Sequence, residues 1–225
     1  MNMLEALRGG LIVSVQAWRG SALDDPHVIA AMAAASQDGG AVAVRIEGVE
    51  NLLAVRQRVA LPIVGLVKRE YPGFDAYISP TLAEVGSIIG AGAEIVAFDA
   101  TSRPRPDGSL LIDTIRAVHA AGRLAMADCA TAEDGAAASA AGADILATTL
   151  CGYTPRTKNH TLPAFDLVTE LSRLGRFGVC EGGVRMPADV RAALDAGADA
   201  VVVGTAITNV DWLVREFAGA ANRGS

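Results

Sequence analysis

The feature that most constrains the fold of this chain is an alternation of eight short apolar segments with longer stretches rich in alanine. Each apolar segment is rich in β-branched residues, and the residues that follow it have helical spacing. The eight segments span residues 11–17, 41–46, 62–68, 94–100, 124–130, 145–150, 177–183 and 200–207. They are nearly continuous apolar runs, which are typical of parallel strands buried on both faces. Helical stretches fill the seven intervals, and residues 212–220 supply an eighth.

Glycines mark the points where helices are expected to give way to strands. The tripeptide Ala-Gly-Ala precedes the apolar segments that begin near residues 94, 145 and 200. Each glycine lies where a helix C-terminus needs a left-handed residue. Eight such βα units predict a compact (β/α)8 TIM barrel, with residues 1–225 as a single domain. An open doubly wound sheet is the alternative, but the Gly-rich turn that usually follows its first strand is missing here.

Composition and charge narrow the possible functions. The chain is 51% hydrophobic and carries a net charge of −6, which excludes general disorder and argues against a nucleic-acid-binding surface. No signal peptide or transmembrane helix is predicted. Three widely spaced cysteines favour a reducing cytoplasm over a disulfide framework. The scattered histidines and cysteines form no known metal-binding spacing, so no metal site is predicted.

Polar residues stand at the ends of nearly all the apolar segments. In a (β/α)8 barrel, the carboxyl ends of the strands form the floor of the active site. The residues at these ends are Gln16, Arg45, Lys68, Asp99, Asp128, Thr148 with Thr149, Glu181, and Gly204 with Thr205. Structural roles remain open for some of them: Asp99 and Asp128 could cap helices or stabilise loops, and Arg45 could pair with an acid across the barrel mouth. Tyr153 is either a lid residue or part of loop packing.

The last two segments end in glycine-rich sequence. Gly182, Gly183 and Gly204 expose backbone N–H groups without a Cβ in the way, and Thr205 follows directly. The loops after strands 7 and 8 of such barrels commonly hold a phosphate group. These two endings predict a phosphorylated small-molecule ligand.

Nine stretches of sequence carry a resemblance to a known family. They are SVQA (14–17), VRIEG (44–48), PIVGLVKREY (62–71), ISPTLAEV (78–85), IVAFDATSRPRPDG (95–108), MADCAT (126–131), TTLCGYT (148–154), CEGGVRMP (180–187) and VVVGTAIT (201–208). On these stretches the chain resembles the N-acetylmannosamine-6-phosphate 2-epimerases over nearly its full length. The resemblance implies a (β/α)8 barrel, often a homodimer, that interconverts N-acetylmannosamine 6-phosphate and N-acetylglucosamine 6-phosphate without a metal or cofactor.

The resemblance also implies roles for individual residues. The catalytic lysine and glutamate of the family fall on Lys68 and Glu181, and its substrate-contacting residues fall on Gln16, Arg45 and Asp128. We expect further substrate contacts from Thr149, at the end of the sixth segment, and from Tyr153, which follows that segment.

Two departures from the family concern the phosphate. The family usually has a basic residue two positions after the glutamate, where this chain has Gly183. It also usually has Arg-Pro after Ala-Ile-Thr, where this chain has Asn209 and Val210. Both changes remove positive charge near the expected phosphate. Two alternatives stay open: another arginine compensates, or selectivity is relaxed and unphosphorylated N-acetylmannosamine is also accepted. We expect Arg185 to join Gly182, Gly183, Gly204 and Thr205 in binding phosphate, although Arg19 and Arg45 are further candidates.

The chemistry implied by the resemblance requires a base. In the open-chain aldehyde, C2 lies next to a carbonyl, so its proton can be removed and returned on the other face. A lysine serves as this base only when it is neutral, which requires a pKa below its usual value. Three alternatives stay open: a Schiff-base aldolase, another phosphosugar isomerase, and a regulator that senses a phosphosugar without turning it over.

Overall fold

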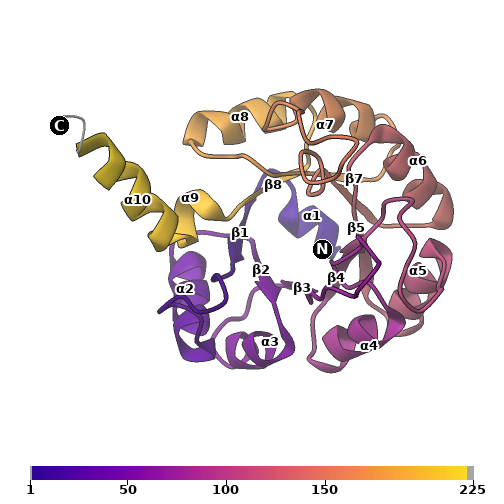
Figure 1. The fold of residues 1–225 in the computed structure, drawn as a ribbon, viewed down its shortest axis with the longest axis horizontal. Helices are drawn as coiled ribbons and strands as arrows, with labels where there is room; N and C mark the ends of the chain where they lie inside the picture. Colours follow the sequence, from indigo (N-terminus) through magenta and orange to yellow (C-terminus); the bar gives the residue numbers. More distant parts are fainter. Residues whose placement is uncertain (1, 222–225) are drawn as a thin grey trace.

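The computed structural model describes residues 2–221, in which eight parallel strands close into a barrel (Figure 1). Each strand pairs with the next along the chain, and β8 pairs with β1. The strands are β1 (Leu11–Val15), β2 (Ala43–Glu47), β3 (Ile63–Leu66), β4 (Ile95–Asp99), β5 (Leu124–Asp128), β6 (Ile145–Ala147), β7 (Phe177–Glu181) and β8 (Ala200–Val203). The predicted (β/α)8 barrel is therefore confirmed. The predicted domain limits, residues 1 and 225, lie outside the described residues.

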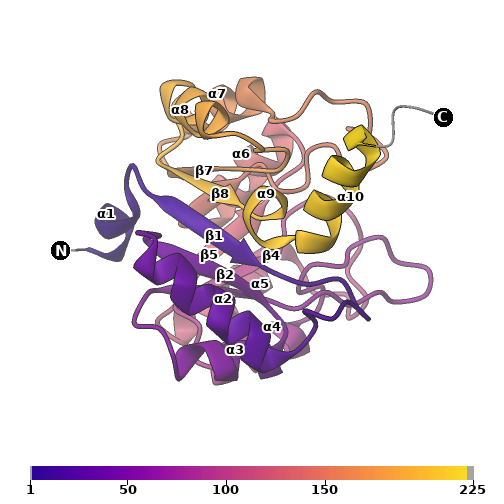
Figure 2. The ribbon, with the colours of Figure 1, turned by 90° about the vertical axis from the view of Figure 1, so that its left-hand side faces the viewer.

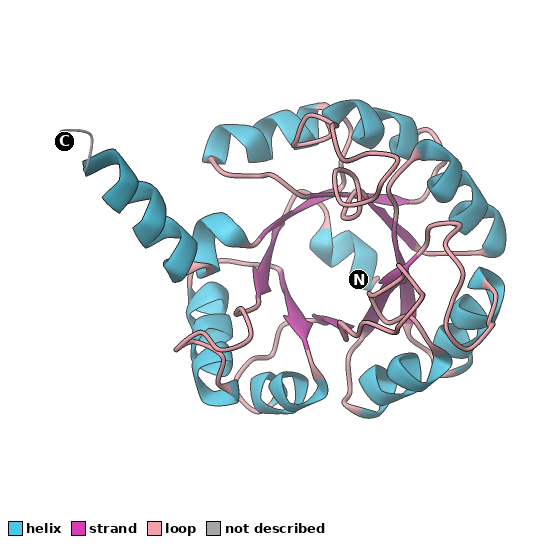
Figure 3. Cartoon of the chain, viewed as in Figure 1, coloured by secondary structure: helices cyan, strands magenta, loops and turns pink. Residues whose placement is uncertain are grey.

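Seven helices lie between the strands and surround the barrel, as the alanine-rich intervals predict (Figure 3). They are α2 (Pro26–Asp38), α3 (Val49–Arg56), α4 (Leu82–Gly90), α5 (Leu111–Ala120), α6 (Ala132–Ala141), α7 (Phe165–Ser172) and α8 (Pro187–Asp195). The three glycines of the Ala-Gly-Ala tripeptides, Gly92, Gly142 and Gly197, have φ values of 89°, 100° and 104°. These left-handed conformations end the helices and turn the chain into the next strand.

The structure differs from the predicted elements at both ends of the chain. A helix that the sequence did not predict, α1 (Met3–Leu7), lies across one end of the barrel and buries Leu7 among the interior strand residues. The predicted segment 200–207 is wrong in its second half, because β8 ends at Val203 and α9 (Thr205–Thr208) follows. Short apolar runs do not distinguish a strand from a buried helical turn.

The last helix, α10 (Val210–Ala221), includes the predicted helical stretch 212–220 but does not pack on the barrel. It projects away from the ring of helices and has no buried residue (Figures 1 and 2). Val214 and Phe217 are 60% and 75% exposed. Within residues 2–221, no helix combines the length and the apolar character needed to cross a membrane.

Side chains of each strand alternate between the barrel interior and the surrounding helices, and this alternation selects the residues of the site. In β2, Ala43 packs in the interior cluster, whereas Val44 and Ile46 pack under the helices. Arg45 therefore points inward. The same alternation turns the polar residues at the other strand ends inward. These are Gln16, Lys68, Asp128, Thr149, Glu181 and Gly204.

Candidate active site

A cavity of about 470 Å³ opens at the carboxyl ends of the strands, a size that suits a small metabolite. Of the residues that the sequence assigned to catalysis, the sugar or the phosphate, all except Asp128 and the further candidate Arg19 line this cavity. The lining residues among them are Gln16, Arg45, Lys68, Thr149, Tyr153, Glu181, Gly182, Gly183, Arg185, Gly204 and Thr205. The barrel thus brings together residues that are separated by almost 190 positions in the sequence.

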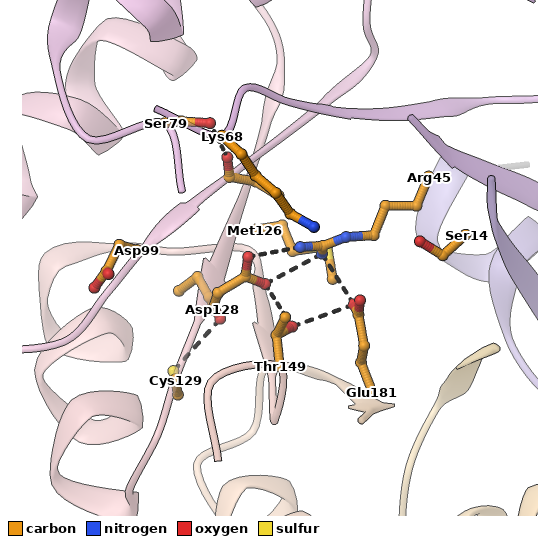
Figure 4. A network of polar contacts seen from close by, with 12 residues as sticks. Ser14, Arg45, Lys68, Ser79, Asp99, Met126, Asp128, Cys129, Thr149 and Glu181 are labelled. Atoms are coloured by element: carbon orange, nitrogen blue, oxygen red, sulfur yellow. Dashed lines mark hydrogen bonds and ion pairs between the residues drawn. The ribbon is translucent and has the colours of Figure 1, made fainter. Parts of the chain in front are cut away.

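Arg45 is the centre of the polar network on the cavity floor (Figure 4). Its two terminal nitrogens bind Asp128 in a fork, with N–O distances of 2.7 and 3.2 Å. Nη1 also lies 3.0 Å from Oε2 of Glu181. The side chains of Arg45 and Asp128 are 1% and 0% exposed, so this pair is fully desolvated. Burial lowers the pKa of Arg45, but the carboxylates of Asp128 and Glu181 outweigh this effect and hold the pKa above its usual value. The guanidinium therefore stays charged.

Asp128 reaches the cavity only through its neighbours. The hydroxyl of Thr149 lies 2.7 Å from Oδ1 of Asp128 and 3.2 Å from Oε2 of Glu181. A hydroxyl has one proton, so Thr149 can donate to only one of the two carboxylates at a time. Because Asp128 is buried behind Arg45 and Thr149, its position suits orientation of these two groups.

Glu181 ends β7, two strands along the barrel from Asp128, and lines the cavity. Burial and the charge of Asp128 raise the pKa of its carboxyl, although Arg45 and the hydrogen bond from Thr149 act in the other direction. Thr148 fixes its backbone: the hydroxyl donates to the carbonyl of Glu181 at 2.8 Å and accepts from its N–H at 3.0 Å. A carboxyl with a raised pKa at a fixed position can act as a proton donor.

Lys68 lies just beyond β3, and its amine points toward the guanidinium of Arg45 (Figure 4). Its side chain is exposed to the open cavity, yet the amine is surrounded by the walls of the barrel mouth. Burial and the positive charge of Arg45 lower the pKa of Lys68, while Glu181, Glu47 and Asp128 oppose this shift. Nζ donates to Oε1 of Gln16 at 2.6 Å.

Gln16 is held in turn by a second hydrogen bond. Its Nε2 donates to the hydroxyl of Ser14 at 2.8 Å. The amide oxygen of Gln16 is therefore turned toward Lys68. Within residues 2–221, no carboxylate oxygen lies within 4.0 Å of the lysine Nζ, so the amine is free of a direct ion pair.

The glycine-rich endings of β7 and β8 lie next to each other, because these two strands are paired. Gly182, Gly183 and Gly204 line the same cavity as the side chain of Arg185. The guanidinium carbon of Arg185 lies 5.4 Å from the centre of the Trp212 ring. Asn209 also lines this cavity.

Three aromatic residues of the cavity were missed by the sequence interpretation: Trp18, Tyr77 and Trp212. None of them ends a strand. Tyr77 reaches the cavity because the loop after β3 folds back, with Ile78 bridged to Lys68. Trp18 follows Gln16 by two positions, which is the only sequence signal for it.

Asp99 takes the structural role that the sequence left open. It accepts hydrogen bonds from the backbone and hydroxyl of Thr101 and pairs with Arg103. It does not line the cavity. Within the described part of the chain, no group of three or more His, Cys, Asp or Glu side chains is arranged to hold a metal ion.

A closed (β/α)8 barrel with a lysine and a glutamate around a buried arginine at its catalytic end defines this chain as a barrel enzyme with an acid–base site. The family model described as "Putative N-acetylmannosamine-6-phosphate epimerase" matches residues 29–223. The chain belongs to this family.

Individual relatives agree with this assignment. A Synechococcus elongatus protein named "Putative N-acetylmannosamine-6-phosphate 2-epimerase" is 46% identical over 225 aligned positions, covering 98% of this chain and 97% of its own. A Clostridium perfringens (strain SM101) protein of the same name is 40% identical over 216 positions, covering 96% and 98%. A solved structure of the N-acetylmannosamine-6-phosphate 2-epimerase from Clostridium perfringens matches with a TM-score of 0.94 at 39% identity, covering 98% and 96%.

Proposed function

We propose that this chain interconverts N-acetylmannosamine 6-phosphate and N-acetylglucosamine 6-phosphate by inverting the configuration at C2. The observation that carries the proposal is the arrangement of Lys68 and Glu181 around the buried Arg45 in one cavity. The relatives that cover nearly the whole chain are named for this substrate.

The pKa of Lys68 is lowered and that of Glu181 is raised, so both shifts run toward a neutral lysine and a protonated glutamate. Moving a proton from Lys68 to Glu181 leaves the net charge of the site unchanged, and the burial of both groups favours the uncharged pair. Neutral Lys68 then removes the proton from C2 of the open-chain sugar. Protonated Glu181 supplies the proton that the reaction needs on the other side.

Arg45 provides the fixed positive charge of the mechanism. Removal of the C2 proton spreads negative charge onto O1 of the aldehyde. The guanidinium is held in place by Asp128 before substrate binds, so it can stabilise this charge without reorganising. We assign Gln16, Thr149 and Tyr153 to the sugar, since all three line the cavity beside the two catalytic groups.

We assign the phosphate to the end of the cavity formed by the loops after β7 and β8. Gly182, Gly183, Gly204 and Thr205 allow close approach of the backbone, and Arg185 supplies a positive charge there. This assignment makes Arg185 the substitute for the two basic residues that the chain lacks.

One further candidate function has a specific observation in its favour. The lowered pKa of Lys68, with no carboxylate close to its amine among the described residues, would also suit an amine that forms a Schiff base, as in an aldolase. Treatment with borohydride in the presence of the sugar phosphate distinguishes the two, because only an imine is trapped as a covalent adduct. We expect no adduct by mass spectrometry.

The direct test of the proposed function is to incubate the purified protein with each of the two 6-phosphates. Nuclear magnetic resonance should show each sugar phosphate converting into the other until the same ratio is reached from both sides. A protein that converts neither sugar phosphate contradicts the proposal.

We also propose that the enzyme is a homodimer of the cytoplasm that binds neither nucleic acid nor membranes. The exposed Val214 and Phe217 of α10 would be covered by a second copy. Light scattering should give twice the mass of the chain, and Phe217→Asp should shift the protein toward the monomer. A wild-type protein that is monomeric at micromolar concentration contradicts the dimer.

A further inference from the structure

The indole of Trp212 and the guanidinium of Arg185 meet at the edge of the cavity although they come from different elements. Arg185 lies in the loop after β7, and Trp212 is the third residue of α10. The guanidinium carbon is 5.4 Å from the ring centroid, which is within the range of a cation–π contact. Both side chains line the catalytic cavity.

Arg185 has no acidic partner within residues 2–221. The neighbouring Asp189 is occupied, because its Oδ2 accepts the backbone N–H groups of Arg185 and Met186 at 2.8 and 2.9 Å. An exposed arginine loses side-chain entropy when it is fixed in one position. Among residues 2–221, the face of Trp212 is therefore the contact that restricts where this guanidinium lies.

Trp212 is itself anchored by contacts at the start of α10. Its backbone N–H donates to Oδ1 of Asn209 at 2.9 Å. Asp211 accepts a hydrogen bond from the hydroxyl of Ser21 at 2.6 Å, which ties the first turn of α10 to the loop after β1. The ring is thus presented to Arg185 by a fixed segment of backbone.

We propose that Trp212 is a positioning residue that holds Arg185 over the phosphate-binding end of the cavity. The proposal rests on the proposed role of Arg185 in binding the substrate phosphate. It assigns part of the specificity for phosphorylated sugar to the first turn of α10, a helix that otherwise makes no buried contact with the barrel. A positioned cation loses less entropy on binding, so the effect falls on affinity for the phosphate and not on the chemical step.

A double-mutant cycle with Trp212→Leu and Arg185→Ala tests the proposal. For N-acetylmannosamine 6-phosphate, we expect Trp212→Leu to raise KM and the calorimetric Kd about two- to fivefold with kcat little changed, which at 1.36 kcal/mol per decade is about 0.5–1 kcal/mol, as for an exposed cation–π contact. Trp212→Phe should recover most of the affinity. In the Arg185→Ala background, Trp212→Leu should have no further effect. Phe74→Leu, which removes an exposed aromatic ring outside the catalytic cavity, serves as the control.

The outcomes separate this proposal from the one on which it rests. If Arg185→Ala weakens binding of the sugar phosphate but Trp212→Leu does not, the positioning role is wrong and the phosphate role of Arg185 stands. If Trp212→Leu weakens binding equally with and without Arg185, the ring acts through another route and the proposal is overturned. It is also overturned if Arg185→Ala leaves the Kd unchanged. Calorimetry decides these cases even in a protein that fails to epimerise the sugar.

Discussion

Nη1 of Arg45 lies 3.0 Å from Oε2 of Glu181 while the same guanidinium is forked onto Asp128. One buried cation therefore serves two carboxylates. Its removal would leave a fully buried negative charge without a partner, which costs about 3–5 kcal/mol.

The first prediction follows from this shared cation. Arg45→Met should lower the melting temperature by roughly 2–4 °C for each kcal/mol lost, in addition to abolishing activity. Arg56→Met is the matched control, because Arg56 pairs with Glu94 at a half-exposed position and should cost about 1 kcal/mol or less. Equal losses in the two variants, measured by calorimetric unfolding, would contradict the structural importance of the buried pair.

The second prediction concerns the hydroxyl between the two carboxylates. The hydrogen bond from Thr149 lowers the pKa of Glu181, so Thr149→Val should raise that pKa further. If Glu181 donates a proton, kcat/KM falls as the pH rises through this pKa, and the falling limb of the profile should move to higher pH. Thr114→Val is the control, because within residues 2–221 this buried hydroxyl has no hydrogen-bond partner. A falling limb that stays in place, or moves to lower pH, argues against Glu181 as the donor.

The third prediction concerns the base. The carboxylate of Glu47 raises the pKa of Lys68 against the larger effect of burial, and its Oε1 accepts the backbone N–H of Lys68 at 3.2 Å. Glu47→Gln removes the charge and retains an acceptor oxygen, so the pKa of Lys68 should fall. Activity that requires the neutral amine should then begin at lower pH. Glu50→Gln, an exposed position on α3, should leave the profile unchanged. If the rising limb of the pH profile does not shift in Glu47→Gln, that limb does not reflect the pKa of Lys68.

The fourth prediction concerns the glycine that replaces a basic residue of the family. Gly183 has a φ of 74°, and a Cβ at this position would lie 2.4 Å from Cβ of Leu162. Gly183→Ala should therefore combine about 1–2 kcal/mol of backbone strain with about 1–3 kcal/mol of overpacking. Gly73→Ala is the matched control, because Gly73 has a φ of 84° and nothing within 4 Å of such a Cβ. Denaturant unfolding that gives the same loss for both variants would show that the contact with Leu162 relaxes freely.

The sequence predicted the parts of the site that depend on strand alternation. Arg45, Asp128 and Glu181 end apolar segments at inward-facing positions, so the closure of the barrel places them together without any further information. The apolar character of the segments also predicted all eight strands. Chemistry-bearing residues at one end of each strand were therefore visible in the pattern itself.

Contacts outside the strands could not be predicted in the same way. Trp212 belongs to an amphipathic helix, and its pattern does not show that α10 leaves the barrel instead of packing against it. Tyr77 depends on how the loop after β3 folds back on Lys68. The position of Asp128 behind Arg45 depends on side-chain packing in the barrel mouth. Such features depend on tertiary contacts, which produce no periodic pattern in the sequence.

The central claim is that Lys68 removes the proton from C2, and its most direct test is deuterium incorporation at C2 in heavy water. The wild-type protein should place deuterium at C2 of N-acetylmannosamine 6-phosphate while it forms the epimer. Lys68→Met should bind the sugar phosphate but exchange C2 at least about 100-fold more slowly, as expected for loss of a general base. A Lys68→Met protein that incorporates deuterium at a rate close to that of the wild type would contradict the account.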